Sequence, residues 1–127
     1  MNKTILIGGL VLGILAVVLG AFGAHGLKKV LTVDELTTFE TGVKYQMYHA
    51  LFLVALSSIS MTTDNVKKTV FYLVIVGVVF FSFSIYGLAT NKLTSFDFKK
   101  IAIITPVGGT LLIAAWSYLL FSILTKK

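Results

Sequence analysis

The sequence predicts an all-α integral membrane protein: an antiparallel four-helix transmembrane bundle with an interfacial amphipathic helix between the first and second spans. Only 16 of the 127 residues are charged, 11 Lys and 5 Asp or Glu. The charges leave four segments without Lys, Arg, Asp or Glu, at residues 4–24, 45–63, 69–91 and 101–125. Each has the length of a bilayer-crossing helix, roughly 17–25 residues. A soluble protein is excluded, because most of its helices would need a polar face.

The net charge and the composition limit the kinds of partner that the protein can bind. We expect residues 1–127 to form one transmembrane domain. The net charge of +6 comes from lysines that flank the spans, where they meet anionic lipid headgroups. The predicted partner is therefore the lipid bilayer and not nucleic acid. Cysteine is absent, which excludes disulfides and iron–sulfur ligation.

The first span, residues 4–24, carries a stripe of small residues. Their spacings of 4, 3, 4 and 3 place them on one helical face; they are Gly9, Gly13, Ala16, Gly20 and Gly23. In lipid, small residues let a second backbone approach closely. We favour packing of this stripe against the protein's own spans. The other interpretation is a contact between copies in a homo-oligomer.

A helix is predicted over residues 33–44, before the second span. Thr32 and Glu35 have the spacing of a capping box, and Leu31 and Leu36 occupy the hydrophobic-staple positions. An apolar stripe then follows at helical spacing. We expect this helix to lie in the membrane interface, or else to run straight on into the second span at 45–63.

The third and fourth spans, 69–91 and 101–125, differ in their regularity. The third is dense in Val and Phe. The fourth contains the only proline, Pro106. Either Asp97 caps a helix that Pro106 kinks, or Thr105 is the N-cap of a helix that starts at Pro106. Both interpretations predict irregular backbone near Thr105–Gly109.

Antiparallel spans bring most polar side chains to the end of the bundle opposite the termini. This candidate polar site comprises His25, Glu40, Lys44, Tyr45, Gln46, His49, Ser84, Tyr86 and Thr105. Polar groups in a membrane are costly, so they are usually paired or functional. Glu40 and Lys44 have the i,i+4 spacing of an ion pair. His25 and His49 are expected at one membrane level on adjacent spans.

These residue types suggest three kinds of chemistry, namely cofactor binding, proton transfer and catalysis. Two imidazoles at one level can hold a haem or a metal, but we favour hydrogen bonds to neighbouring groups and expect no cofactor. A proton path through His49, Tyr45 and Glu40 lacks ionisable groups in the other half of the membrane. Ser84 and Thr105 have no base and orienting group beside them in sequence, so we expect no enzyme.

Three blocks resemble a known family. Residues 20–27 (GAFGAHGL), 39–51 (FETGVKYQMYHAL) and 105–109 (TPVGG) are similar to the signature of the domain-of-unknown-function 423 family, small bacterial membrane proteins (YgdD- and YwdK-like) related to eukaryotic transmembrane protein 256. The resemblance covers essentially the whole chain. It implies a multi-pass protein of the bacterial inner membrane without an assigned activity.

The resemblance also implies which positions matter. The motif positions are His25, Glu40, Gly42, Tyr45, His49, Ser84, Tyr86, Pro106 and Gly108. We add Gly9, Gly13, Gly20 and Gly109 as structural positions. Phe83 departs from the pattern, because a smaller residue is expected there, and this puts a shared cavity beside the third span in doubt.

The function predicted from these observations is non-catalytic: an accessory subunit, an assembly factor or a homo-oligomeric membrane component. The small-residue face and the lack of a catalytic set support it. The alternative is a channel or transporter for a small solute, an ion or protons, favoured by the irregular backbone expected at 105–109, since such backbone lines protein or water at membrane depth.

Overall fold

The computed structural model describes residues 2–95 and 97–126, and this part of the chain holds helices and no strand. The main helices are α1 (Asn2–His25), α2 (Val33–Ser58), α3 (Asp64–Val78), α4 (Ser84–Ala89) and α5 (Ile104–Thr125). A π-helix, Val79–Phe83, joins α3 to α4 without a break. Short 3-10 turns lie at Leu27–Lys29, Asn91–Leu93 and Phe98–Ile101.

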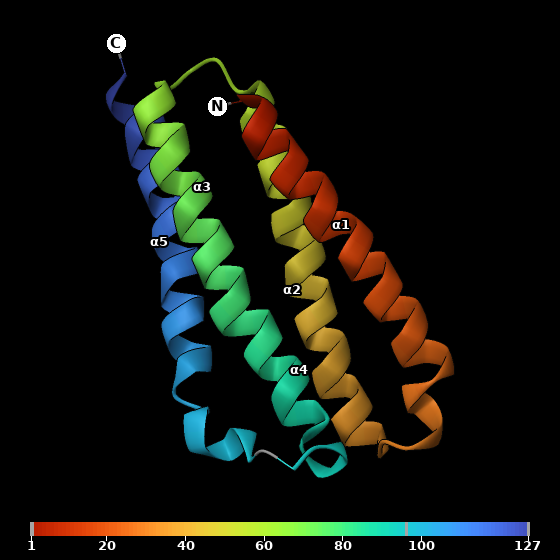
Figure 1. The fold of residues 1–127 in the computed structure, drawn as a ribbon. Coiled ribbons are helices and arrows are strands. Elements are labelled where there is room, and N and C mark those ends of the chain that lie inside the picture. The colour runs from red at the N-terminus through yellow and green to blue at the C-terminus, as the bar shows by residue number, and fades with distance from the viewer. Residues whose placement is uncertain (1, 96, 127) are drawn as a thin grey trace.

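The helices run in alternating directions (Figure 1). Both termini lie at one end, which we call the terminus end, together with the loop between α2 and α3. The loops after α1 and α4 lie at the opposite end, called the loop end. The predicted antiparallel order of the chain is therefore present in the structure.

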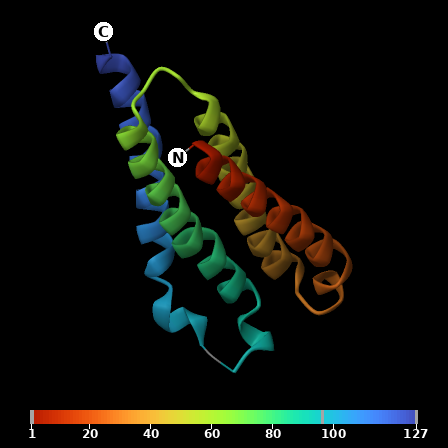
Figure 2. The same cartoon turned by 45° about the horizontal axis from the view of Figure 1, so that its top comes forward.

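The helices form two pairs. α1 packs on α2, and α3 packs on α5, as the turned view makes visible (Figure 2). α2 joins the pairs through its contacts with α3, the π-helix and α4. The shared core is aliphatic, with Ile5, Leu53, Leu56, Val70, Val74 and Val78 fully buried.

The glycine stripe of α1 faces α2, as we favoured. A Cβ atom on Gly9 would lie 2.9 Å from the carbonyl oxygen of Ala50 and 3.0 Å from the amide nitrogen of Val54. Gly23 packs on Phe39 in the same way nearer the loop end. The stripe is thus used for close contact inside one chain.

Within residues 2–95 and 97–126, three stretches are long and apolar enough to cross a bilayer: Asn2–Lys29, Asp64–Ala89 and Ile104–Thr125. α2 is not among them, because charged and polar residues continue through its first half. α2 is also one unbroken helix from Val33 to Ser58. The structure therefore has no separate helix over residues 33–44, and the second of the two predicted alternatives, a helix that runs straight on, is the one observed.

The capping box at the start of α2 is confirmed. The backbone N–H of Thr32 donates to Glu35 Oε1 (2.8 Å), and the backbone N–H of Glu35 donates to Thr32 Oγ1 (3.1 Å). Leu31 and Leu36 belong to one small cluster with Phe39 and Ala89. Glu35 also accepts from Lys92 Nζ at 2.8 Å, so it ties the loop after α4 to the start of α2.

The Glu35 ion pair predicts a pH dependence. The hydrogen bond from Lys92, and then that from the Thr32 backbone, hold the pKa of the Glu35 carboxyl below its usual value of 4.5. A lowered pKa stabilises the folded state above the unfolded pKa, and this is lost as the pH falls through the folded pKa. Unfolding measured in detergent between pH 6 and pH 3 should show this loss, and Glu35→Gln should flatten the curve. Equal slopes in both proteins would contradict it.

α5 begins differently from either prediction. Asp97 caps the 3-10 turn Phe98–Ile101 by accepting from the backbone N–H of Lys99 (3.1 Å). A new helix then starts at Ile104, with Ile103 as N-cap. Pro106 is its third residue, where a missing N–H costs nothing because the first-turn donors have no helical acceptor. Pro106 therefore makes no kink, and the backbone at 105–109 is regular helix, contrary to prediction.

Candidate functional site

The irregular backbone lies in the third span and not in the fourth. The π-helix Val79–Phe83 faces the first half of α5, where Gly108 is packed against it. A Cβ on Gly108 would lie 2.4 Å from the backbone nitrogen of Phe81. π-bulges are rare and are frequently found at functional sites. The hydropathy of the sequence does not distinguish a π-helix from an α-helix, so the π-helix at Val79–Phe83 was not predicted.

Gln46 is the centre of a buried hydrogen-bond chain. Its Nε2 donates to the carbonyl oxygen of Leu12 in α1 (2.9 Å), and its Oε1 accepts from the Tyr86 hydroxyl of α4 (2.6 Å). Gln46 is fully buried. Gly42 lies one turn earlier and leaves space for the Tyr86 ring. A Cβ atom on Gly42 would lie 2.6 Å from that ring. This chain joins three helices.

Two serines fasten the π-helix and α4 to their neighbours. Ser82 is fully buried, and its hydroxyl donates to the carbonyl oxygen of Gly42 (2.8 Å). The Ser84 hydroxyl lies 2.6 Å from the Thr105 hydroxyl and also reaches the carbonyl oxygen of Phe81 (2.9 Å). Ser84 and Thr105 thus meet as a hydroxyl pair, with no basic side chain bonded to either in the described residues.

His49 is buried and pairs with a residue that sequence reasoning did not connect to it. Trp116 Nε1–H donates to His49 Nε2 (3.0 Å), and His49 Nδ1 lies 2.7 Å from the carbonyl oxygen of Tyr45. Indole can only donate, so His49 Nε2 is the acceptor and Nδ1 carries the proton. The sequence held one signal for this pair: Trp116 is a lone tryptophan midway along an apolar span. Tryptophan in membrane proteins usually lies at the interface instead.

The two histidines are not brought together. Gly23 packs on Phe39, and His25 lies two residues further toward the loop end. His49 lies ten residues after Phe39 along α2, about 15 Å at a rise of about 1.5 Å per residue. The prediction of one level was wrong because α2 begins at Val33, which places His49 in mid-helix. A shared metal needs both imidazoles within about 2 Å of it, so the pair does not fit a haem or a metal.

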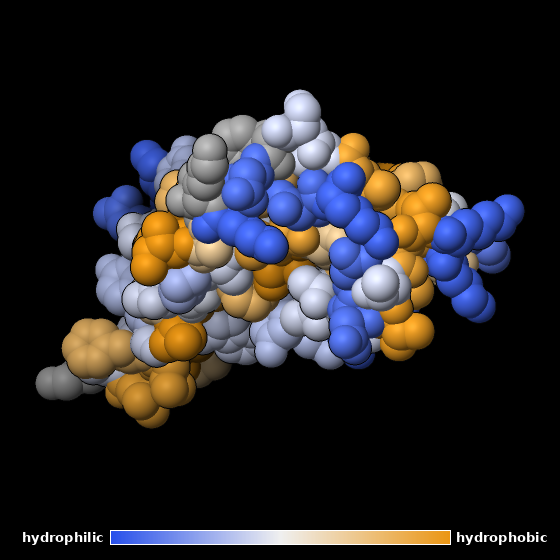
Figure 3. Space-filling view, turned by 90° about the horizontal axis from the view of Figure 1, so that it is seen from below, coloured by the Kyte–Doolittle hydropathy of each residue, from blue (hydrophilic) through white to orange (hydrophobic). Residues whose placement is uncertain are grey.

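The remaining predicted residues lie outside the buried chain. His25, Glu40, Lys44 and Tyr45 are exposed. Glu40 and Lys44 form no ion pair with each other; within the described ranges the ion pair joins Glu35 and Lys92. At the loop end, hydrophilic side chains cover much of the surface between apolar patches (Figure 3). Phe83 points outward beside Tyr86, with ring centroids 5.6 Å apart, and Phe81 lines the neighbouring cavity instead.

The site therefore consists of hydrogen-bonded pairs. Among the side chains that the structure describes, no buried nitrogen or oxygen atom lacks a hydrogen-bond partner. The polar groups connect α1, α2, α4 and α5. Such groups are costly in lipid unless they are satisfied, so their first effect is to hold the helices in one arrangement.

Comparison with known proteins identifies the family of the chain. Residues 19–109 match the model of the family described as "Protein of unknown function (DUF423)". The chain belongs to the DUF423 family. It is 42% identical to the UPF0382 membrane protein SSP2132 of Staphylococcus saprophyticus, over 90% of this chain and 91% of that one. No solved structure matches it.

Two further relatives of this DUF423 protein extend the comparison. The UPF0382 membrane protein YwdK of Bacillus subtilis is 38% identical over 90% of both chains. The UPF0382 inner membrane protein YgdD of Escherichia coli is 33% identical over 99% of this chain and 93% of that one. This DUF423 protein is accordingly a multi-pass membrane protein, and the expected family is confirmed.

Proposed function

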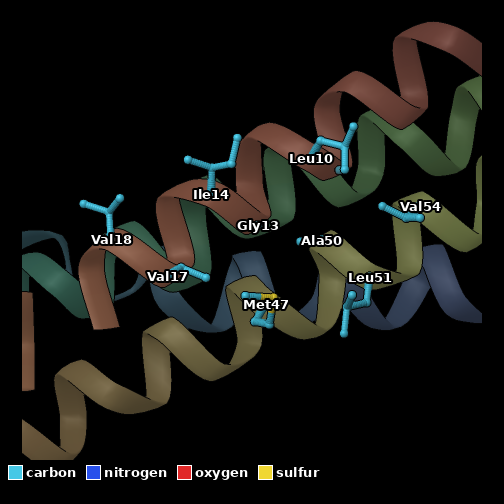
Figure 4. Close-up of a pocket in the computed structure, with 10 residues that line it drawn as sticks. Leu10, Gly13, Ile14, Val17, Val18, Met47, Ala50, Leu51 and Val54 are labelled. Carbon is cyan, nitrogen blue, oxygen red and sulfur yellow. The ribbon is translucent and has the colours of Figure 1, made fainter. Parts of the chain in front are cut away.

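We propose that this DUF423 protein is a non-catalytic component of a membrane assembly, which contributes a docking surface for another transmembrane helix. The observation that carries the proposal is an apolar groove of about 430 Å³ between α1 and α2 (Figure 4). The buried polar side chains that the structure describes are hydrogen-bonded to one another or to backbone carbonyl oxygens, so none of them is left free for a reaction.

α2 is proposed to cross the membrane with the other three helices. It has 26 residues, about 39 Å at about 1.5 Å per residue. α2 packs along α1 from Gly23 to Gly9, and α1 is long and apolar enough to cross the bilayer. Its charged first turns would then lie at the loop end of the bundle, outside the hydrocarbon.

The groove is suited to a helix because of Gly13. This glycine lies on its floor, and a Cβ there would meet only the Cβ of Ala50, at 3.7 Å. The walls are aliphatic: Leu10, Ile14, Val17, Val18, Met47, Leu51 and Val54. Small residues beneath aliphatic walls let two helices approach closely, and packing drives their association in lipid. The partner is another transmembrane helix, from a second copy or another protein.

A groove-filling variant tests this proposal. Gly13→Leu should reduce cross-linked or co-purified complexes about tenfold, because a leucine would occupy the space of the partner helix. Cross-linking in native membranes, followed by gentle extraction and native mass spectrometry, measures this and identifies the partner. Val11→Leu is the control, because Val11 is exposed on α1 but does not line the groove.

The proposal fails on either of two results. One is that the wild-type protein is a monomer without a partner after cross-linking in native membranes. The other is that both variants assemble like wild type. A channel is the competing function, and proteoliposome flux above empty liposomes, lost in His49→Ala, would favour it instead.

A further inference from the structure

A second cavity lies on the opposite side of α2 from the α1 groove, in the seam between α2 and α5. Its volume is about 350 Å³, near the lower limit of small-molecule sites, which is about 300 Å³. It borders the π-helix through Phe81 and α5 through Gly109. It is separate from the groove on which the proposed function rests.

The cavity combines aromatic walls with polar atoms. Tyr45, His49 and Trp116 line it. The Trp116 N–H is engaged by His49, so Trp116 presents its ring. The Tyr45 ring stands edge-on to Phe81, with centroids 5.0 Å apart. Among the described residues the Tyr45 hydroxyl has no hydrogen-bond partner, so it is a donor available to a ligand.

The depth of the cavity restricts the ligand. Trp116 is the thirteenth of the 22 residues of α5, which places the His49–Trp116 pair near the middle of the span. Among the described residues no lysine lines the cavity, so a carboxylate or a phosphate would be uncompensated at this depth. The ligand must therefore be uncharged and soluble in the membrane.

The seam continues beyond Trp116. A groove of about 530 Å³ shares Trp116 with the cavity and follows α2 and α5 toward the terminus end. Its lining is apolar apart from the Tyr48 hydroxyl and the Trp116 indole. A ring in the cavity can therefore carry an apolar chain that lies along the same seam.

We propose that the α2–α5 cavity binds the ring of a membrane-soluble quinone. A quinone ring is flat and uncharged, and its carbonyl oxygen can accept the hydrogen of the Tyr45 hydroxyl. Its face packs against the rings of Trp116 and Phe81, and its apolar chain occupies the adjoining groove. Gly109 leaves the opening on the α5 side. Quinone binding in this cavity is independent of the proposed docking of a partner helix in the groove between α1 and α2.

The single tryptophan of the chain provides the readout. Quinones quench indole fluorescence, and Trp116 is the only tryptophan. Purified protein in lipid nanodiscs would be titrated with 2-methyl-1,4-naphthoquinone. We expect saturable quenching. Tyr45→Phe should weaken the affinity about tenfold by removing the donor, and Gly109→Ala should weaken it about tenfold by narrowing the cavity.

The controls separate binding from collision and from misfolding. Tyr118→Phe removes a hydroxyl outside the cavity and should leave the affinity unchanged. The added methyl of Gly109→Ala lies 3.5 Å from the Phe81 ring, an ordinary contact that keeps the fold, and thermal unfolding checks this. Quenching that rises linearly and equally in all variants overturns the proposal. Equally strong competition by 2-methylnaphthalene, which lacks the oxygens, also overturns it.

Discussion

Gly108→Ala should destabilise the fold by about 3 kcal/mol, because the added methyl would overlap backbone that cannot move away. Its Cβ would lie 2.4 Å from the nitrogen of Phe81 and 2.7 Å from the carbonyl carbon of Phe80. Both atoms belong to the π-helix, which Ser82 anchors to α2. α5 would have to separate from the α3–α4 helix, and contacts such as Gly77 against Leu112 would be lost with it.

The neighbouring glycine is a matched control. Gly109→Ala adds the same methyl one residue later, where it meets only the Phe81 ring at 3.5 Å or more. Its stability should stay within about 0.5 kcal/mol of wild type. Reversible unfolding in mixed micelles measures both variants. If Gly108→Ala were as stable as Gly109→Ala, the close packing of α5 on the π-helix would be wrong.

Gln46→Leu should destabilise the protein by about 2 kcal/mol, because the partly buried Tyr86 hydroxyl would lose its partner. The leucine keeps most of the side-chain volume, so the effect reports on the hydrogen bonds and not on a cavity. Tyr86→Phe should cost a similar amount by leaving Gln46 Oε1 without its donor. The double variant should be more stable than the sum of the single effects predicts, with a coupling of about 1 kcal/mol.

The corresponding control removes a hydroxyl that stays within one helix. Thr110 donates to the carbonyl oxygen of Pro106 and is exposed. Thr110→Val should therefore change stability by no more than about 0.5 kcal/mol. Additive effects of the Gln46 and Tyr86 variants would mean that the two side chains do not interact in the folded protein.

Local patterns predicted much of the architecture correctly. The Thr32–Glu35 capping box and the Leu31–Leu36 staple depend on residues within one helical turn, so they can be read from the sequence. The stripe from Gly9 to Gly23 depends on the period of one helix. Gly9 and Gly23 pack closely within the chain, as favoured, whereas Gly13 lies in the open groove between α1 and α2. Pro106 was predicted either to kink a helix or to be the first residue of one, and neither is observed, because its position in the first turn of α5 depends on where the preceding 3-10 turn ends.

The candidate site was predicted only in part. Gln46, His49, Ser84, Tyr86 and Thr105 were named, and the structure places all of them in hydrogen bonds. Their partners were not predicted, and His25 was wrongly placed beside His49. The error came from the predicted start of the second span at Tyr45. α2 begins twelve residues earlier, at Val33, so His49 lies further along the helix from the loop end than was predicted.

Hydrophobicity and local capping therefore determined which segments are helices and where the chain reverses, because both depend on neighbouring residues. Tertiary structure alone decided that Trp116 meets His49, 67 residues away, and that Tyr86 meets Gln46, 40 residues away. Such pairs depend on the rotation and axial shift of each helix. These are set by the close contacts of Gly9, Gly42 and Gly108 with other helices, which no single segment specifies.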